Sequence, residues 1–226
     1  MKQTFPINLV DGHLLISDNG NTILVDTGSP MTVHNTQSLH FLGREFKTHT
    51  SILGSKVSDL SKLAGIEFST ILGMDILTRY KVVFDYENRQ LTFLSPDEVG
   101  MEGTVIPLLN LMGAVGVKVG IAGQELVMAV DTGAPLSYIS ESVTSDMQPV
   151  GEKEDFHPIA GRYTTPVYEL ESEAAGRTFA ASYGILPSLL ALPLQFGSID
   201  GVIGYDFFKS FRVMLDFRSG IAIIAR

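Results

Sequence analysis

Short apolar runs separated by Gly, Asn and Asp turns follow one another along most of the chain. The first such run covers residues 5–10, Asp11-Gly12 is a turn signal, and further runs cover residues 13–16 and 22–25. Short runs bounded by tight-turn dipeptides are typical of antiparallel strands. Helical periodicity is rare, and the clearest case is the short segment 74–79. The pattern therefore predicts a mostly β protein.

The second half of the chain repeats the order of elements found in the first. Residues 209–217, for example, have the same apolar pattern as residues 80–86. A polar segment rich in Pro and Gly, residues 95–103, lies between the two halves and is typical of a linker. A repeat of this length predicts two structural copies packed together, residues 1–97 and residues 98–226.

The composition is that of a globular protein with enough apolar residues for a core. Of the 226 residues 45% are hydrophobic, and 16 Lys and Arg against 25 Asp and Glu give a net charge of −9. An acidic chain with no basic cluster argues against nucleic acid and anionic membranes as partners. The absence of cysteine excludes disulfides, thiolate metal ligands and a cysteine nucleophile.

The first ten residues lack the basic start and long apolar run of a secretory signal peptide. No apolar run approaches the length of a membrane span. These observations favour a cytoplasmic protein. The alternative is a folded piece trimmed from a longer protein.

One motif occurs in both halves, each time at the end of an apolar run. Leu24–Pro30 has the sequence LVDTGSP, and Ala129–Pro135 has the sequence AVDTGAP. The apolar pair is typical of the end of a buried strand, and the glycine permits a tight turn or close backbone approach. Each copy therefore places one carboxylate, Asp26 or Asp131, on a turn at the end of a core strand. If the two turns face each other, the two carboxylates meet at one site.

A second motif follows each copy. Ile71-Leu72-Gly73 and Val202-Ile203-Gly204 each precede an aspartate and an apolar pair. Together with the two Asp-Thr-Gly turns, these residues resemble the aspartic peptidases over nearly the whole chain, in a single-chain form similar to a fused retropepsin dimer or a small pepsin. The resemblance implies a two-lobed acid-protease β-barrel fold with a pseudo-twofold internal repeat. It also implies that the terminal strands, residues 2–5 and 221–225, join a sheet that bridges the lobes.

The two lobes are not expected to be symmetric. The offset between the copies is 131 − 26 = 105 residues at the aspartates and 204 − 73 = 131 residues at the second motif. The second lobe therefore has 131 − 105 = 26 additional residues. They fall within residues 144–193.

The resemblance implies a catalytic role for Asp26 and Asp131. In this chemistry one ionised carboxylate takes a proton from a water that attacks the scissile carbonyl, and the other carboxyl, protonated, donates to the carbonyl oxygen. Two carboxylates about 3 Å apart cannot easily both be ionised, so their pKa values separate. The route has no covalent intermediate and needs no cofactor.

Supporting roles follow from the same resemblance. Thr27 and Thr132 are expected to hydrogen-bond to the opposite turn. Gly28 and Gly133 are expected to donate N–H groups to the carboxylates. Gly73 and Gly204 are expected to leave room for the strand behind each turn. Ser29 can donate a hydrogen bond to the neighbouring aspartate and so lower its pKa, whereas Ala134 cannot. This mixed pair predicts a mildly acidic pH optimum.

Other polar residues have simpler interpretations. Asp75 and Asp206 are interpreted as helix caps. The histidines form no recognised metal-ligand spacing, so no metal site is expected. They are His13, His34, His40, His49 and His157.

The substrate is expected to lie extended between the lobes beneath a hairpin flap. Residues 41–48 could form a short first-lobe flap without a tyrosine. Residues 157–163 are the better candidate, and Tyr163 could then cover the cleft, or it could be a core or surface residue. The prediction is a monomeric aspartic endopeptidase acting on a peptide or protein. Two alternatives stay open: a catalytically silent peptide-binding module on the same fold, and a processing protease that cuts one partner.

Overall fold

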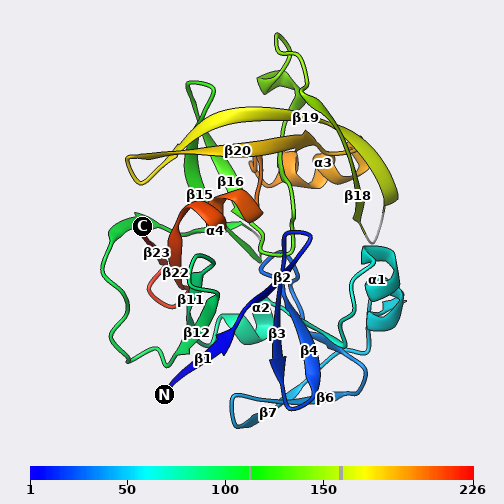
Figure 1. Ribbon diagram of the computed structural model, residues 1–226, viewed down its shortest axis with the longest axis vertical. Helices are drawn as coiled ribbons and strands as arrows, with labels where there is room; N and C mark the ends of the chain where they lie inside the picture. Colours follow the sequence, from blue (N-terminus) through cyan, green and yellow to red (C-terminus); the bar gives the residue numbers. More distant parts are fainter. Residues whose placement is uncertain (112, 158–159) are drawn as a thin grey trace.

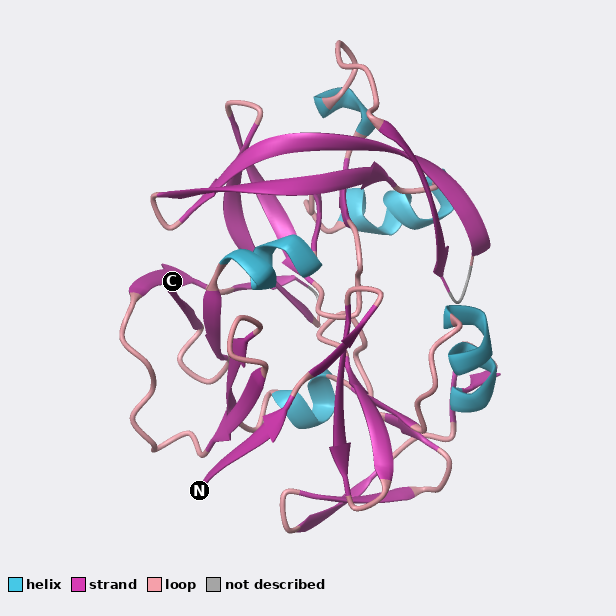
Figure 2. Ribbon diagram, viewed as in Figure 1, coloured by secondary structure: helices cyan, strands magenta, loops and turns pink. Residues whose placement is uncertain are grey.

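The computed structural model describes residues 1–111, 113–157 and 160–226. It is mostly β, as the apolar pattern predicts, with a few short helices set against the sheets (Figures 1 and 2). Among the described residues no helix has both the length and the apolar character needed to cross a membrane.

One six-stranded sheet combines strands from both ends and the middle of the chain. Its order is β1-β12-β11-β22-β23-β13. These strands are β1 (Lys2–Pro6), β11 (Lys81–Asp85), β12 (Gln90–Leu94), β13 (Thr104–Pro107), β22 (Arg212–Asp216) and β23 (Ile221–Ala225). β1 pairs with β12 and β23 pairs with β13, both antiparallel, so the predicted inclusion of the terminal strands is confirmed. β11 pairs with β22 and joins the two halves of the chain.

A five-stranded sheet comes entirely from residues 1–97, in the order β2-β3-β4-β10-β5. Its strands are β2 (Asn8–Val10), β3 (His13–Asp18), β4 (Asn21–Val25), β5 (Val33–His34) and β10 (Thr70–Leu72). The hairpins begin as the sequence predicts, because Asp11-Gly12 and Asn19-Gly20 have the positive φ angles that the tightest hairpin turns require. The same half contains two small hairpins and two helices. They are β6 (Ser38–Phe41) with β7 (Arg44–Lys47), β8 (Ser51–Ile52) with β9 (Ser55–Lys56), α1 (Val57–Ala64) and α2 (Met74–Leu77).

An eight-stranded sheet comes entirely from residues 98–226, in the order β14-β15-β16-β21-β17-β20-β19-β18. Its strands are β14 (Leu109–Leu111), β15 (Ala114–Ile121), β16 (Gln124–Val130), β17 (Ser137–Ile139), β18 (Gly151–His157), β19 (Gly161–Ala174), β20 (Arg177–Ile185) and β21 (Gly201–Ile203). The helical segments are η1 (Glu141–Val143), α3 (Ser188–Phe196) and α4 (Tyr205–Ser210). Much of the additional length predicted within residues 144–193 lies in β18, β19 and β20.

The two halves share one strand arrangement around the Asp-Thr-Gly turns. β4 pairs in parallel with β10, and β5 lies antiparallel on the other side of β10. In the second half β16 pairs in parallel with β21, and β17 lies antiparallel on the other side of β21. Parallel pairing places the ends of both partners at the same edge, so each Asp-Thr-Gly turn emerges beside the start of the helix that follows the second motif.

The largest apolar cluster contains residues from both halves. Phe84 of β11 and Phe208 of α4 are buried with ring centroids 5.0 Å apart, and Tyr86 stacks on Phe208 at 5.6 Å. Burying apolar surface stabilises a fold by roughly 25 cal/mol per Å². Because this core crosses the β11–β22 boundary, each half stabilises the other.

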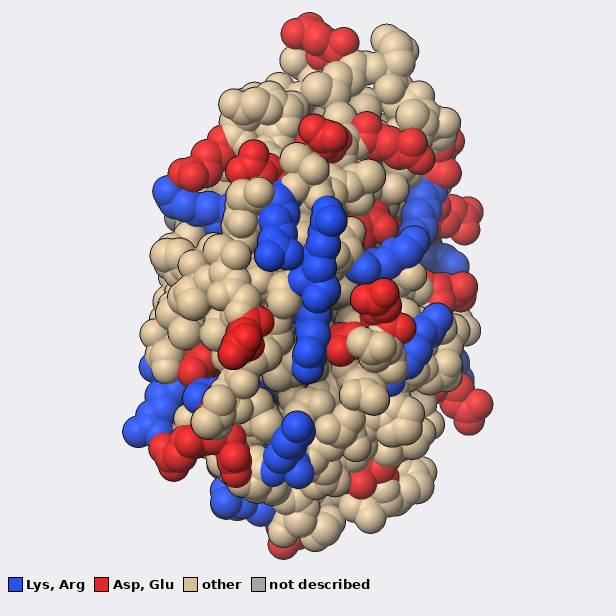
Figure 3. Space-filling model, turned by 60° about the vertical axis from the view of Figure 1, so that its left-hand side comes forward, with Lys and Arg blue, Asp and Glu red and all other residues tan. Residues whose placement is uncertain are grey.

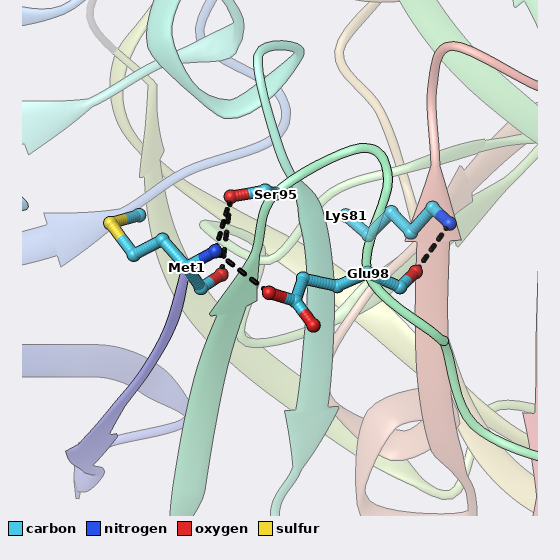
Figure 4. A network of polar contacts seen from close by, with 4 residues as sticks. All are labelled: Met1, Lys81, Ser95 and Glu98. Carbon is cyan, nitrogen blue, oxygen red and sulfur yellow. Dashed lines mark hydrogen bonds and ion pairs between the residues drawn. The ribbon is translucent and has the colours of Figure 1, made fainter.

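The predicted linker is held at its start by the N-terminal residue. The amino group of Met1 donates to Ser95 Oγ at 2.7 Å and to Glu98 Oε1 at 2.8 Å, and Lys81 Nζ donates to the Glu98 carbonyl at 2.9 Å (Figure 4). The hydrogen bond and positive charge of the amino group lower the pKa of the Glu98 carboxyl. These contacts fix the linker to β1 and β11.

One face of the molecule carries a line of Lys and Arg side chains among acidic ones (Figure 3). On the side of β22 and α4, Arg89, Lys209 and Arg212 line a cavity of about 540 Å³ together with Asp85. Arg212 Nε lies 3.2 Å from Asp85 Oδ2, so positive charge in this cavity is partly neutralised. None of the predicted site residues lines it.

Candidate active site

The two Asp-Thr-Gly turns begin in the same way. The backbone N–H of Asp26 donates to the Leu72 carbonyl at 3.0 Å, and that of Asp131 donates to the Ile203 carbonyl at 2.9 Å. These bonds continue the parallel pairing of β4 with β10 and of β16 with β21 by one residue. Each aspartate is therefore fixed at the end of a buried strand, as its sequence context predicts.

The structure brings Asp26 and Asp131 together. The pKa of each carboxyl is shifted by its interaction with the other. A Cβ atom added to Gly28 would lie 2.4 Å from Asp131 Oδ2, and one added to Gly133 would lie 2.7 Å from Asp26 Cγ. Each turn thus presses its glycine against the carboxyl of the other turn, and a larger residue would push the two carboxyls apart.

Backbone N–H groups point at both carboxyls. Gly28 N donates to Asp26 Oδ1 at 2.8 Å and Ser29 N donates to the same oxygen at 3.0 Å. Gly133 N donates to Asp131 Oδ1 at 2.8 Å. Such donors favour the ionised form of a carboxyl and partly offset the cost of burying its charge.

Thr27 and Thr132 bind across to the opposite turn. The Thr27 hydroxyl donates to the Val130 carbonyl and the Thr132 hydroxyl to the Val25 carbonyl, each at 2.8 Å. Both hydroxyls also accept a backbone N–H from the opposite threonine. Both side chains are buried, so water does not compete for these bonds.

The glycines of the second motif lie directly behind the turns. A Cβ on Gly73 would lie 2.5 Å from the Met31 backbone, and one on Gly204 would lie 2.3 Å from the Ala134 carbonyl oxygen. Met74 N donates to the Ser29 carbonyl at 2.9 Å, and Tyr205 N donates to the Ala134 carbonyl at 3.0 Å. Only glycine leaves enough room for this approach.

The sequence analysis did not identify one pair of supporting hydroxyls. Thr32 Oγ1 accepts Gly73 N at 3.0 Å, and Ser137 Oγ accepts Gly204 N at 3.1 Å. The available signal was the equal spacing, because each hydroxyl residue lies six positions after its aspartate (32 − 26 = 6 and 137 − 131 = 6).

Two expectations about side chains near the turns are wrong. The Ser29 hydroxyl donates to the Met31 carbonyl at 2.9 Å, so it is the backbone of Ser29 and not its side chain that binds Asp26. Asp75 accepts the Thr32 hydroxyl at 2.6 Å, and Asp206 accepts Ser182 N at 2.9 Å. Neither is a helix cap, because α2 and α4 start after glycines with no side-chain cap bond.

Burial and proximity raise the pKa of the paired carboxyls. Burial raises the pKa of Asp26 well above its usual value, and the charge of Asp131 and the hydrogen bond to it raise it further. Burial also raises the pKa of Asp131, against the opposing effect of its Gly133 hydrogen bond. The pair therefore keeps one proton at pH values where an exposed aspartate has lost it.

The charge of Asp131 affects the pKa of two histidines. They are His13, at the start of β3, and His157, at the end of β18. Burial lowers the pKa of both, and the negative charges of Asp131 and Asp155 oppose this effect. The turn that leads into His13 abuts the second Asp-Thr-Gly motif, since a Cβ on Gly12 would lie 2.9 Å from Pro135 Cβ.

The two flap candidates differ in packing. The β6–β7 hairpin has Leu39, Phe41 and Phe46 buried, and Phe41 contacts the rings of Phe5 and Phe93 at 5.6 and 5.3 Å. This is the packing of a core element, so residues 41–48 do not form a flap.

The second candidate contains a chain of hydroxyl contacts. Tyr163 OH donates to Tyr138 OH at 3.0 Å, and Tyr138 OH donates to the Asp155 carboxylate. Burial raises the pKa of Tyr163 to about 12. Tyr163 is thus a half-buried member of the β18–β19 hairpin. Pro158 and Ile159, which belong to the predicted flap, lie outside the described residues.

No cluster of three or more potential metal ligands occurs within residues 1–111, 113–157 and 160–226. The charged groups that meet at the turns are the two carboxyls.

Comparisons with known proteins give partial matches only. No family model and no curated protein sequence matches the chain. A simian foamy virus protease in solution is 24% identical over 32% of this chain and 78% of its own, with a TM-score of 0.28. A foamy viral protease–reverse transcriptase, solved with an RNA/DNA hybrid, is 22% identical over 40% of this chain and 11% of its own, with a TM-score of 0.32. The function must therefore be argued from the site itself.

Proposed function

We propose that the protein is an aspartic endopeptidase whose catalytic pair is Asp26 and Asp131. The observation that carries the proposal is the meeting of the two Asp-Thr-Gly turns, in which the glycine of each turn lies against the carboxyl of the other. Two carboxyls that share one proton can act at once as base and acid, which hydrolysis of an amide requires.

In this proposal one water molecule binds between the two carboxyls. The ionised carboxyl takes a proton from the water as the oxygen attacks the scissile carbonyl carbon. The protonated carboxyl donates to the carbonyl oxygen, where negative charge develops. Collapse of the tetrahedral intermediate then breaks the C–N bond: the leaving amine takes the proton that the first carboxyl removed from water, and the hydroxyl formed from the carbonyl oxygen returns its proton to the second carboxyl. No covalent enzyme intermediate forms, and both carboxyls return to their starting state.

We assign residues 1–97 and 98–226 to the N-terminal and C-terminal lobes of a pseudo-twofold acid-protease fold. The shared arrangement of β4, β10 and β5 with β16, β21 and β17 supports this assignment. Because one chain supplies both turns, a monomer has all the groups that the reaction needs.

The substrate in this proposal is a peptide or protein segment bound in extended form between the lobes. The β18–β19 hairpin, with Tyr163, would cover it as the flap. Support comes from His157, whose position near the end of this hairpin lies within the electrostatic influence of Asp131. An extended peptide offers backbone groups to such a hairpin in the manner of an added strand.

A cleavage screen tests the proposal. The protein would be incubated with a diverse peptide pool from about pH 3 to pH 7.5, with and without pepstatin. The variants Asp26→Asn and Asp131→Asn keep the size of the side chain but remove its ability to ionise. Asp146→Asn makes the same change at an exposed position and serves as the control.

We expect wild-type cleavage that both site variants lose and the control keeps. Cleavage that survives both site changes would contradict the assignment of the pair. No cleavage at any pH, combined with tight binding of pepstatin, would instead support a catalytically silent peptide-binding module.

A further inference from the structure

The C-terminus of α1 is completed by a side chain from the other half of the chain. α1 ends at Gly65, whose φ of 70° reverses the backbone. The last carbonyl groups of a helix have no partner within it. Gly65 N binds the Lys62 carbonyl and Ile66 N binds the Ser61 carbonyl, each at 3.2 Å. The next carbonyl, that of Leu63, accepts Arg162 Nη2 at 2.9 Å across 99 residues of sequence.

This contact combines favourable charge with easy reversal. The C-terminal end of a helix carries partial negative charge, so a guanidinium is well placed there. Arg162 is exposed, however, and water competes for the same donors. A bond of this kind can break and re-form many times without unfolding either element.

Arg162 lies on β19 near the turn end of the hairpin, opposite Phe156 of β18. β18 and β19 pair from Gly151 with Val167 to His157 with Gly161. The next pair, Asp155 with Tyr163, is tied to β17, because Tyr138 OH donates to Asp155 and accepts from Tyr163 OH. Figure 1 shows β18 running down toward α1. The end of the hairpin is therefore in contact with α1 through Arg162, and the charge of Asp131 acts on His157 at the same end.

We propose that Arg162 is the latch of a strap, formed by the described residues of β18 and β19, that closes over Asp26 and Asp131 by binding the Leu63 carbonyl. The inference rests on the proposed peptidase function. In it, the Arg162–Leu63 bond opens to admit a peptide and re-forms above it. Arg162 is a positioning residue, since it acts on the substrate only through the strap.

Hydrogen exchange tests the latch without any need for activity. Backbone exchange would be followed by mass spectrometry in wild type, Arg162→Ala and Arg162→Lys. Arg177→Ala removes the same charge at the start of β20, beside the far end of β19, and is the matched control. We expect Arg162→Ala to speed exchange several-fold in β18, in the start of β19 and in the last turn of α1. Arg162→Lys should recover much of the protection, because an ammonium group can also donate to the Leu63 carbonyl.

Equal exchange in wild type and Arg162→Ala would overturn the latch. So would an equal change in Arg177→Ala, because the effect would then come from charge and not from the contact. In peptide cleavage we expect Arg162→Ala to raise KM several-fold with a smaller effect on kcat, and to leave the thermal unfolding midpoint close to that of wild type.

A chemical crosslink tests whether the strap must open. The chain has no cysteine, so Lys62→Cys with Arg162→Cys provides the only two thiols. A short bismaleimide would join the last turn of α1 to the strap. We expect the crosslinked protein to bind pepstatin far more slowly than either single-cysteine variant. Equal binding rates would contradict opening as a step of entry.

The two proposals fail separately. If wild type cleaves no peptide but Arg162→Ala still loosens the strap, the peptidase assignment fails and the latch remains. If cleavage depends on both aspartates but exchange is unchanged in Arg162→Ala, the latch fails and the peptidase assignment remains.

Discussion

Thr27 and Thr132 hydrogen-bond to each other twice, each backbone N–H donating to the hydroxyl of the other residue at 3.0 Å. Each hydroxyl then donates onward to a carbonyl of the opposite turn. The donor and acceptor capacity of both hydroxyls is used inside the protein. The relative position of the two aspartates therefore depends on these two side chains as much as on the aspartates themselves.

Thr27→Val should destabilise the protein by about 1–3 kcal/mol, because it leaves Thr132 N and the Val130 carbonyl buried without their partners. Thr27→Ser keeps the hydroxyl and should recover most of the loss. Urea unfolding monitored by circular dichroism measures both. A valine variant as stable as wild type would show that these groups find other partners.

Gly28→Ala should abolish peptide cleavage, because the new methyl group would lie 2.4 Å from Asp131 Oδ2. The carboxyls would have to separate, and the shared proton would be lost. Gly151→Ala adds the same methyl group where no atom lies within 4 Å and is the matched control. Steady-state cleavage rates of the two variants decide the matter: similar rates would mean that the pair tolerates the displacement.

Asp26→Asn should change how the free energy of unfolding depends on pH. Burial raises the pKa of Asp26, so the folded state binds a proton more tightly than the unfolded chain does. Wild-type stability is therefore lost as pH rises from the unfolded pKa through the raised folded pKa. Asp26→Asn removes this loss, and we expect it to be more stable than wild type at pH 7 by on the order of 1 kcal/mol.

Below about pH 3.5 both Asp26 and an unfolded aspartate are protonated, and the advantage of Asp26→Asn should disappear. Urea titrations at pH 3.5 and pH 7 give the comparison. If Asp26→Asn is more stable than wild type by the same amount at both pH values, the stabilisation comes from packing and not from ionisation. For catalysis, the same pair predicts a bell-shaped rate profile, because activity requires one carboxyl ionised and one protonated.

Tyr138→Phe should loosen the strap where it is tied to β17. The change removes the hydroxyl that donates to Asp155 and accepts from Tyr163. A hydrogen bond to a charged group contributes about 1.5–3 kcal/mol. We expect faster amide exchange in β18 and weaker peptide binding. Tyr168→Phe, on β19 with Tyr163, is a control for loss of a tyrosine hydroxyl. Unchanged exchange in Tyr138→Phe would mean that strand pairing alone holds the strap.

The sequence predicted the parts of the structure that depend on local pattern. Asp11-Gly12 and Asn19-Gly20 form the expected tight turns, and both ends of the chain join the six-stranded sheet. The position of Asp26 followed from the apolar pair that precedes it, because such a pair ends a buried strand. Asp131 followed from the same context in the second half.

The sequence could not predict which partner a side chain binds, a very short helix, or a contact between residues far apart in the chain. The Ser29 hydroxyl binds the carbonyl of Met31 and not the Asp26 carboxyl. α1 is only eight residues long with two buried residues, too short for a clear helical period. The Arg162–Leu63 contact joins residues far apart in sequence and leaves no local signal.

The order of the six-stranded sheet indicates what would happen if the chain were cut between its two halves. Its first three strands, β1, β12 and β11, come from residues 1–97, and its last three, β22, β23 and β13, come from residues 98–226. The β11–β22 pairing therefore joins the three strands of the first half to the three strands of the second half. If the chain were cut within residues 95–103, this pairing would become a subunit interface. Two co-expressed fragments would then assemble as a heterodimer whose activity depends on concentration, each fragment supplying one aspartate.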